Sequence, residues 1–194
     1  MIPVKPVPEP PDFGPRARQP GALWLASHPE PERPRDFWSP FKHVLHQGFG
    51  ERCGYAAMLD LAGGTVDHYI SVAARRDLAY EWSNYRFASA LMNGIKGGAD
   101  DSVLDPYEVG EDWFEILLPS LQLVATERVP PHLREKAAFT LKRLRLGHDE
   151  RLIRWRQSLY DQYRRGLLPL EGLREYAPLI ARAVEKTSQP GVRR

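Results

Sequence analysis

The sequence predicts an α+β fold, with short strands in the middle of the chain and helices in its last third. Residues 1–40 hold 11 of the 18 prolines, and proline fixes φ and lacks an N–H donor, which favours an extended arm. Residues between 53 and 126 include short β-prone segments separated by glycine. Residues 130–187 carry apolar side chains at helical spacing. We therefore expect an arm at 1–40, a mixed core at 41–128 and a helical subdomain at 129–188.

The composition is that of one globular domain with an appended subdomain. The chain has 194 residues, of which 42% are hydrophobic, enough for a core. Its single cysteine excludes a disulfide framework and fits a reducing cytoplasm. No apolar run approaches the roughly 20 residues of a membrane span. We expect a cytoplasmic protein with no membrane partner.

The Pro-rich arm has two interpretations. It either lies over the rest of the domain, anchored by Leu23, Trp24 and Leu25, or binds a partner protein. We favour the first, because these apolar residues need a surface to cover them.

The residues after the arm predict a short helix and then a β-hairpin. Ser39 and Pro40 suit the N-cap and first position of a helix that runs from Phe41 to about Gln47. Residues 53–61 and 65–70 flank Gly63-Gly64, a pattern typical of two strands joined by a glycine-rich turn.

A second helix is expected from about Asn84 to Ile95, capped by Ser83 and ended by Gly97-Gly98. Phe87, Leu91 and Ile95 are spaced by four and would face the core. Together with the hairpin, this helix makes a ββα unit.

The second half of the chain predicts a hairpin and three helices. The strands lie near 112–117 and 121–126, and the helices at about 130–146, 149–165 and 170–186. Between residues 134 and 165 there are ten Lys or Arg against four acidic residues. Such a face attracts DNA phosphates, although a solvated helix surface has the same composition.

The residues with chemical potential lie between Thr65 and Lys96. Asp67 and His68 are adjacent, Asn84 follows sixteen residues after His68, and Asn93 nine residues after that. Hydrolysis of a phosphodiester needs a base to deprotonate water, which histidine can supply, and a cation to stabilise developing charge. Mg²⁺ prefers oxygen ligands such as those of Asp67 and Asn93.

This order of Asp-His, Asn and Asn-x-x-Lys resembles the HNH nuclease motif, also called the ββα-metal or His-Me finger. The HNH domain of the CRISPR effector nuclease and the small HNH proteins of Septu-type and retron-type bacterial defence systems share this form. The motif covers about a sixth of the chain. Asp105-Pro106 and the hairpin after it match the small defence proteins and extend the resemblance to about half of the chain.

The resemblance implies a role for each residue. His68 would be the general base, Asp67 and Asn93 would hold Mg²⁺ or Mn²⁺, and Asn84 would fix the loop that orients His68. Lys96 would contact phosphate. Neighbouring side chains on a regular strand point to opposite faces, so the resemblance also implies that the strand departs from regular pleat at Asp67 and His68.

The sequence departs from many HNH domains in one respect. Their two Cys-x-x-Cys pairs bind a structural zinc, whereas the corresponding positions here are Cys53, Ala56, Ser89 and Met92. One cysteine cannot supply the four S or N ligands of such a site, so we expect no zinc.

The functional expectation is therefore a metal-dependent HNH endonuclease that cuts DNA. The resemblance further implies an anti-phage defence effector whose partner is a regulatory ATPase or another defence-system protein. Two alternatives remain open: a non-catalytic HNH scaffold that binds nucleic acid or protein, and an RNA-cutting toxin that uses the same site.

Overall fold

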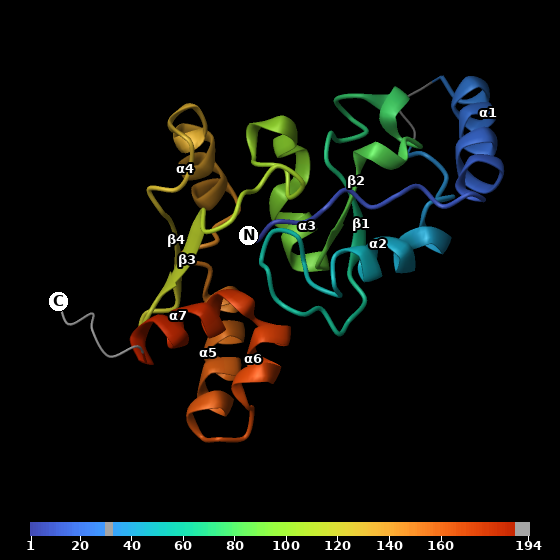
Figure 1. Ribbon diagram of the computed structural model, residues 1–194. Helices are drawn as coiled ribbons and strands as arrows, with labels where there is room; N and C mark the ends of the chain where they lie inside the picture. Colours follow the sequence, from blue (N-terminus) through green and yellow to red (C-terminus); the bar gives the residue numbers. More distant parts are fainter. Residues whose placement is uncertain (30–32, 189–194) are drawn as a thin grey trace.

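The computed structural model describes residues 1–29 and 33–188 and has the expected mixed α+β architecture. These residues form seven α-helices and two separate two-stranded antiparallel sheets. Figure 1 shows α1 at one end of the molecule and α5, α6 and α7 at the other, with β1, β2 and α3 between them.

A ββα unit lies at the centre, but its second strand is not the one predicted. Strand β1, Thr65–His68, pairs with β2, Tyr85–Ala88, in an unbroken register from Thr65↔Ala88 to His68↔Tyr85. The pairing is thus regular through His68, without the expected departure from regular pleat. Helix α3, Ala90–Lys96, follows β2 directly.

The prediction of a helix from Asn84 was wrong in its first half. Residues 85–88 are aromatic-rich, all four are buried, and they satisfy their backbone by pairing with β1. The cap is Ser89 rather than Ser83, since the Ser89 side chain accepts a hydrogen bond from the Met92 amide. The predicted end at Gly97 is correct, and Gly97 has a positive φ of 49°.

The predicted strand at 53–61 is absent. Its backbone turns back on itself, with the Ala57 amide donating to the Cys53 carbonyl and the Cys53 amide to the Met58 carbonyl. Ala57 has a φ of 55°, which a regular strand does not allow. Only an isolated bridge between Arg52 and Leu59 retains strand pairing. The apolar residues that suggested a strand fill the core instead, among them Tyr55 and Met58.

The two faces of the β1–β2 sheet contribute to different apolar clusters. Val66, Tyr85 and Phe87 belong to a cluster with Phe13, Trp38, Phe41 and Trp82 from the N-terminal half and the loop before β2. Ala88, with Met92 of α3, belongs to a second cluster that extends to the C-terminal helices. The sheet therefore packs against the N-terminal segment through one cluster and against α3 and the C-terminal helices through the other.

The N-terminal arm lies over the domain but is not extended throughout. Residues 14–27 are helical, as a π-helical turn, Gly14–Arg18, and α1, Gln19–Ser27. Pro15 lies in the first turn of this helical stretch, where no N–H donor is needed, and Pro20 lies near the junction of the π-helical turn and α1. The buried anchors are Met1, Phe13 and Ala17, whereas Leu23 is 74% exposed. Residues 30–32 of the predicted arm lie outside the part of the chain that the structure describes.

The short helix after the arm is confirmed. A 3₁₀ turn, Ser39–Phe41, leads into α2, Lys42–Gly48. Pro40 occupies the start of the turn as expected. Ser39 is not the cap, however, because Asp36 accepts hydrogen bonds from its amide and its hydroxyl at 2.9 and 2.5 Å.

The second half of the chain matches the prediction except at one break. Strands β3, Phe114–Leu117, and β4, Gln122–Ala125, form the predicted hairpin. A 3₁₀ turn, Pro131–Leu133, precedes α4, Arg134–Arg143, and α5 spans Glu150–Arg164. The third predicted helix is two helices, α6, Leu170–Tyr176, and α7, Pro178–Ser188. Pro178 explains the break, because the residue before a proline is disfavoured in the α conformation.

One apolar cluster joins the helical region to the ββα unit. Tyr55 and Met92 belong to the same cluster as Leu144, Leu152 and Ile180. Among the residues described, no helix has the length and apolar character needed to cross a bilayer.

Candidate functional site

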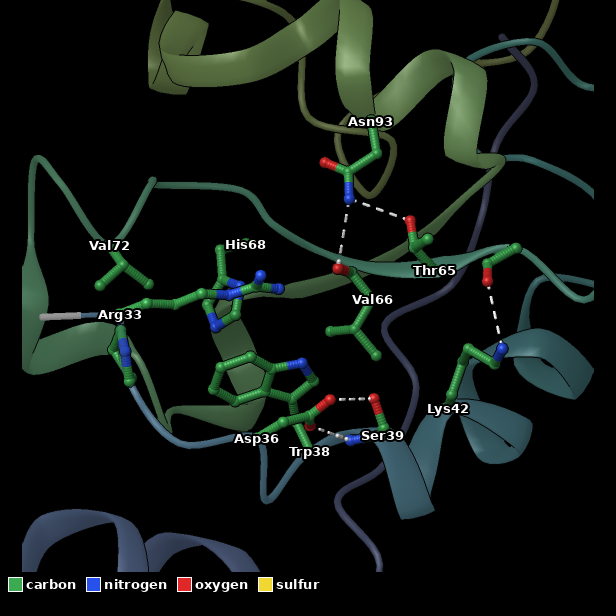
Figure 2. A pocket seen from close by; sticks show the side chains of 12 residues that line it. Arg33, Asp36, Trp38, Ser39, Lys42, Thr65, Val66, His68, Val72 and Asn93 are labelled. Atoms are coloured by element: carbon green, nitrogen blue, oxygen red, sulfur yellow. Dashed lines mark hydrogen bonds between the residues drawn. The ribbon is translucent and has the colours of Figure 1, made fainter. Parts of the chain in front are cut away.

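A cavity of about 410 Å³ lies where β1, α3 and the N-terminal segment meet. His68 and Asn93 of the predicted motif line it. Figure 2 shows Asn93 reaching in from α3 on one side, with Trp38, Ser39 and Lys42 on the other. Residues far apart in the sequence thus form a single opening around the histidine.

The His68 ring is held in one tautomer by the backbone. Its Nε2 lies 2.9 Å from the carbonyl oxygen of Ala79. Because a carbonyl only accepts, Nε2 must carry the proton, and in the neutral ring Nδ1 keeps its lone pair. No described residue forms a hydrogen bond with Nδ1. His68 is therefore arranged to accept a proton through Nδ1.

Aromatic neighbours fix the plane of this ring and keep it neutral. Trp38 and Tyr85 meet it edge to face, with ring centroids 4.8 and 5.0 Å away. Burial lowers the pKa of His68 from its ordinary value of 6.5, against the opposing effect of the Ala79 carbonyl. A lowered pKa leaves the base form dominant at neutral pH.

Asn84 holds both ends of the loop between β1 and β2. Its side-chain oxygen accepts from the Ile70 amide at 2.8 Å, and its amide nitrogen donates to the carbonyls of Ile70 and Leu78 at 2.9 and 3.3 Å. Leu78 precedes Ala79, whose carbonyl binds His68. The buried Asn84 thus bonds to the start of the loop and to the residue before Ala79.

Asp67 and Lys96 form a buried ion pair on the opposite side of β1. The Lys96 ammonium donates to Asp67 Oδ1 at 3.0 Å and to the His68 carbonyl at 2.9 Å. The Tyr55 hydroxyl donates to Asp67 Oδ2 at 2.6 Å. Burial and the neighbouring carboxylate raise the pKa of Tyr55 well above 10, so it remains a donor. Both Asp67 oxygens are therefore occupied, and Lys96 is fully buried rather than open to phosphate.

Asn93 faces the cavity with a free oxygen. Its amide nitrogen donates to Thr65 Oγ1 at 2.9 Å and to the Val66 carbonyl at 3.4 Å. Figure 2 shows the amide oxygen turned away from both acceptors. No hydrogen bond to that oxygen joins it to the described residues.

The predicted metal ligands are only partly brought together. The Asn93 oxygen is a suitable ligand for Mg²⁺ in the cavity, since Mg²⁺ keeps several waters and needs few protein oxygens. Asp67 becomes a ligand at the same ion only if the cation displaces the Lys96 ammonium. In the part of the chain that the structure describes, no cluster of three or more His, Cys, Asp or Glu forms a further metal site.

The sequence pattern did not reveal the N-terminal contribution to this cavity. Arg33, Asp36, Trp38 and Lys42 line it together with His68. The Lys42 ammonium donates to the Gly64 carbonyl at 3.1 Å, which places a cation beside β1. The Ser39-Pro40 signal located the start of this helix, but contact with His68 depends on the path of the chain and has no local signal.

No protein-family model matches the chain. Searches of curated proteins and of solved structures likewise found no match.

Proposed function

We propose that the chain is a metal-dependent HNH-type endonuclease that hydrolyses phosphodiester bonds in DNA. The observation that carries this proposal is the His68 ring, whose Nε2–H donates to the Ala79 carbonyl and whose Nδ1 has no hydrogen bond to the described residues. The ring lines a cavity together with Asn93, Lys42 and Arg33. A fixed base beside cations is the arrangement that hydrolysis of a phosphate ester needs.

In the proposed reaction, His68 Nδ1 takes a proton from a water molecule as the water oxygen attacks phosphorus. The bond between phosphorus and the leaving sugar oxygen breaks, and that oxygen takes a proton from solvent. Lys42 and Arg33 place positive charge beside the phosphate. Asn93, and Asp67 if released from Lys96, would hold a divalent cation, which when bound would stabilise the developing negative charge.

The buried Asp67–Lys96 pair favours one alternative, a non-catalytic HNH scaffold that binds nucleic acid or protein. If Lys96 permanently occupies Asp67, the cation has one protein ligand instead of two. The RNA-cutting alternative uses the same His68 chemistry and is separated from the lead proposal by substrate. The regulatory ATPase or other defence partner remains a proposal that rests on the sequence resemblance.

Plasmid nicking tests the proposal. The wild-type chain with Mg²⁺ or Mn²⁺ should convert supercoiled DNA to the open circle, and His68→Ala should lower the rate by about 100- to 10,000-fold, the usual contribution of a general base. His43→Ala is the matched control, because His43 is an exposed histidine on the neighbouring helix α2.

Equal rates for the wild type and His68→Ala would contradict the proposed base. Absence of nicking with either cation, together with intact DNA binding, would favour the non-catalytic alternative. Cleavage of RNA but not of DNA by the wild type would favour the toxin alternative.

A further inference from the structure

Four arginines form a surface patch beside α3, on a different side from the His68 cavity. Two adjoining hollows of about 460 Å³ each share Arg145 and Arg151 in their linings. One also contains Arg154, Asp149 and Glu150, and the other Arg143. We call Arg143, Arg145, Arg151 and Arg154 the arginine patch.

The arginine patch lies in a basic part of the chain. Between residues 134 and 165 there are ten Lys or Arg against four acidic residues, whereas the whole chain has a net charge of only +2. The two hollows contain the four arginines against two carboxylates, those of Asp149 and Glu150. This local excess of positive charge attracts a polyanion.

Two of the four arginines have structural partners. Arg143 donates to the carbonyls of Ile95 and Lys96 at the end of α3. Arg151 binds Asp149 through two hydrogen bonds of 3.0 and 2.8 Å, which lowers the pKa of Asp149 to about 2. Each therefore holds the local fold.

The other two are available to a ligand. Arg145 and Arg154 are exposed, and within residues 1–29 and 33–188 no side chain or carbonyl pairs with either guanidinium. A planar guanidinium suits a phosphate, which it can bind through two parallel hydrogen bonds.

Helix α3 connects the patch to the candidate active site. Asn93 lines the His68 cavity, while Leu91, Gly94 and Ile95 of the same helix line the hollow that contains Arg143. The two openings thus lie on two sides of one helix, roughly 10 Å across with its side chains. A DNA strand advances about 3.4 Å per phosphate, so this distance corresponds to about three nucleotides.

The α3 side of the hollow that contains Arg143 is formed partly by small residues. Ala90 is exposed, and a Cβ added at Gly94 would meet no atom within 4 Å. This side of α3 therefore leaves room for a phosphate backbone beside the arginines.

We propose that the arginine patch binds the phosphate backbone of duplex DNA about three nucleotides from the phosphodiester positioned at His68. The proposal rests on the proposed function for the identity of the polyanion. Arg145 and Arg154 make the phosphate contacts, and Arg143 and Arg151 hold the surface on which they lie. Such contacts position the duplex without reading its sequence.

The test is binding of a short fluorescent DNA duplex by anisotropy, over a series of salt concentrations and in the presence of a chelator so that no cleavage occurs. Arg145→Gln/Arg154→Gln should weaken binding roughly tenfold or more and reduce the slope of log K against log salt by about 2, since each phosphate contact contributes about 0.9. The matched control is Arg164→Gln/Arg165→Gln, which removes the same charge from the exposed far end of α5.

Equal losses in the patch and control variants would overturn the proposal, because net charge alone would then explain binding. Unchanged binding in the patch variant, or binding of RNA but not of duplex DNA, would also overturn it. The assay does not depend on catalysis. Patch-dependent DNA binding without any nicking would therefore reject the nuclease proposal while keeping the DNA surface.

Discussion

At the scale of single residues, the side of β1 that each side chain occupies decides what the motif can do. Asp67 and His68 are adjacent, and because β1 pairs regularly with β2 through both, they point to opposite faces. His68 meets Trp38 and Tyr85, whereas Asp67 meets Tyr55 and Lys96. The resemblance implied that the strand would bend so that both side chains could face one site. The structure instead keeps the strand regular, and the two side chains face different neighbours.

Lys96 is the residue whose interpretation changed most. Its position in the Asn-x-x-Lys pattern suggested contact with phosphate, but it is fully buried against Asp67. A buried carboxylate without its partner is costly, so Lys96→Met should lower the free energy of unfolding by about 3–5 kcal/mol. Chemical denaturation measures this loss, and Lys96→Met/Asp67→Asn should recover part of it because no unpaired charge remains.

The same variants test the exchange of Lys96 for a cation. Mn²⁺ should raise the Tm of Lys96→Met, where Asp67 is free to bind it, by more than it raises the Tm of the double variant. An equal effect of Mn²⁺ on both variants would show that Asp67 is not a ligand, independently of any nicking activity.

At the scale of elements, the loop from residue 69 to residue 84 determines the orientation of His68. The order of apolar and polar residues in this loop follows neither the helical nor the strand period. Its shape depends on the Asn84 side chain, which forms hydrogen bonds with the backbone of Ile70 and Leu78. The resemblance implied that Asn84 fixes this loop, and an asparagine side chain can bond to it in two ways because it has both a donor and an acceptor. The acceptor of His68, the Ala79 carbonyl, had no signal in the sequence because every residue has a carbonyl.

Asn84→Ala should free this loop. The variant leaves the Ile70 amide and the Ile70 carbonyl unpaired, whereas the Leu78 carbonyl keeps the Glu81 amide as a donor. The loss should cost about 2–4 kcal/mol, from a penalty of about 1–3 per buried group. Hydrogen exchange should accelerate more in residues 69–84 than in α5, because the lost hydrogen bonds hold the loop locally. The control is Ser83→Ala, an exposed neighbour expected to change stability by less than about 0.5 kcal/mol. Similar exchange rates in both variants would contradict the clamp.

Strand and helix boundaries around the site show the limit of local patterns. Residues 53–61 and 85–88 are both short and apolar, so propensity alone could not decide which of them pairs with β1. The paired residues are 23 positions apart at Thr65↔Ala88 and 17 positions apart at His68↔Tyr85. The helices of the last third, by contrast, were located within a few residues, because helical periodicity is a local property.

At the scale of the whole molecule, the N-terminal segment is part of the core rather than an appendage. Phe13 is completely buried and packs against the rings of Phe41, Trp82 and Tyr85. The distances between ring centroids are 5.1, 5.1 and 5.8 Å. Since Tyr85 in turn contacts His68, the segment supports the candidate site as well as lining it.

Phe13→Ala should therefore destabilise the protein by about 3–5 kcal/mol, the usual range for removal of a buried aromatic ring. Leu23→Ala, on the exposed side of α1, should change stability by less than about 0.5 kcal/mol. Thermal and chemical denaturation of the two variants measures the difference. A loss for Phe13→Ala as small as that for Leu23→Ala would mean that the segment contributes little to the stability of the folded state.

The sequence by itself determined the α+β class, the order and spacing of Asp67, His68, Asn84, Asn93 and Lys96, and the main helices of the last third. These features depend on residue type and on neighbours within a few positions. Only the tertiary structure decided that β2 completes the sheet, that Lys96 neutralises Asp67, and that Trp38 and Lys42 share a cavity with His68. The physical reason is that such contacts join residues 17 or more positions apart. The burial of apolar surface brings these residues together, and no local pattern encodes their contact.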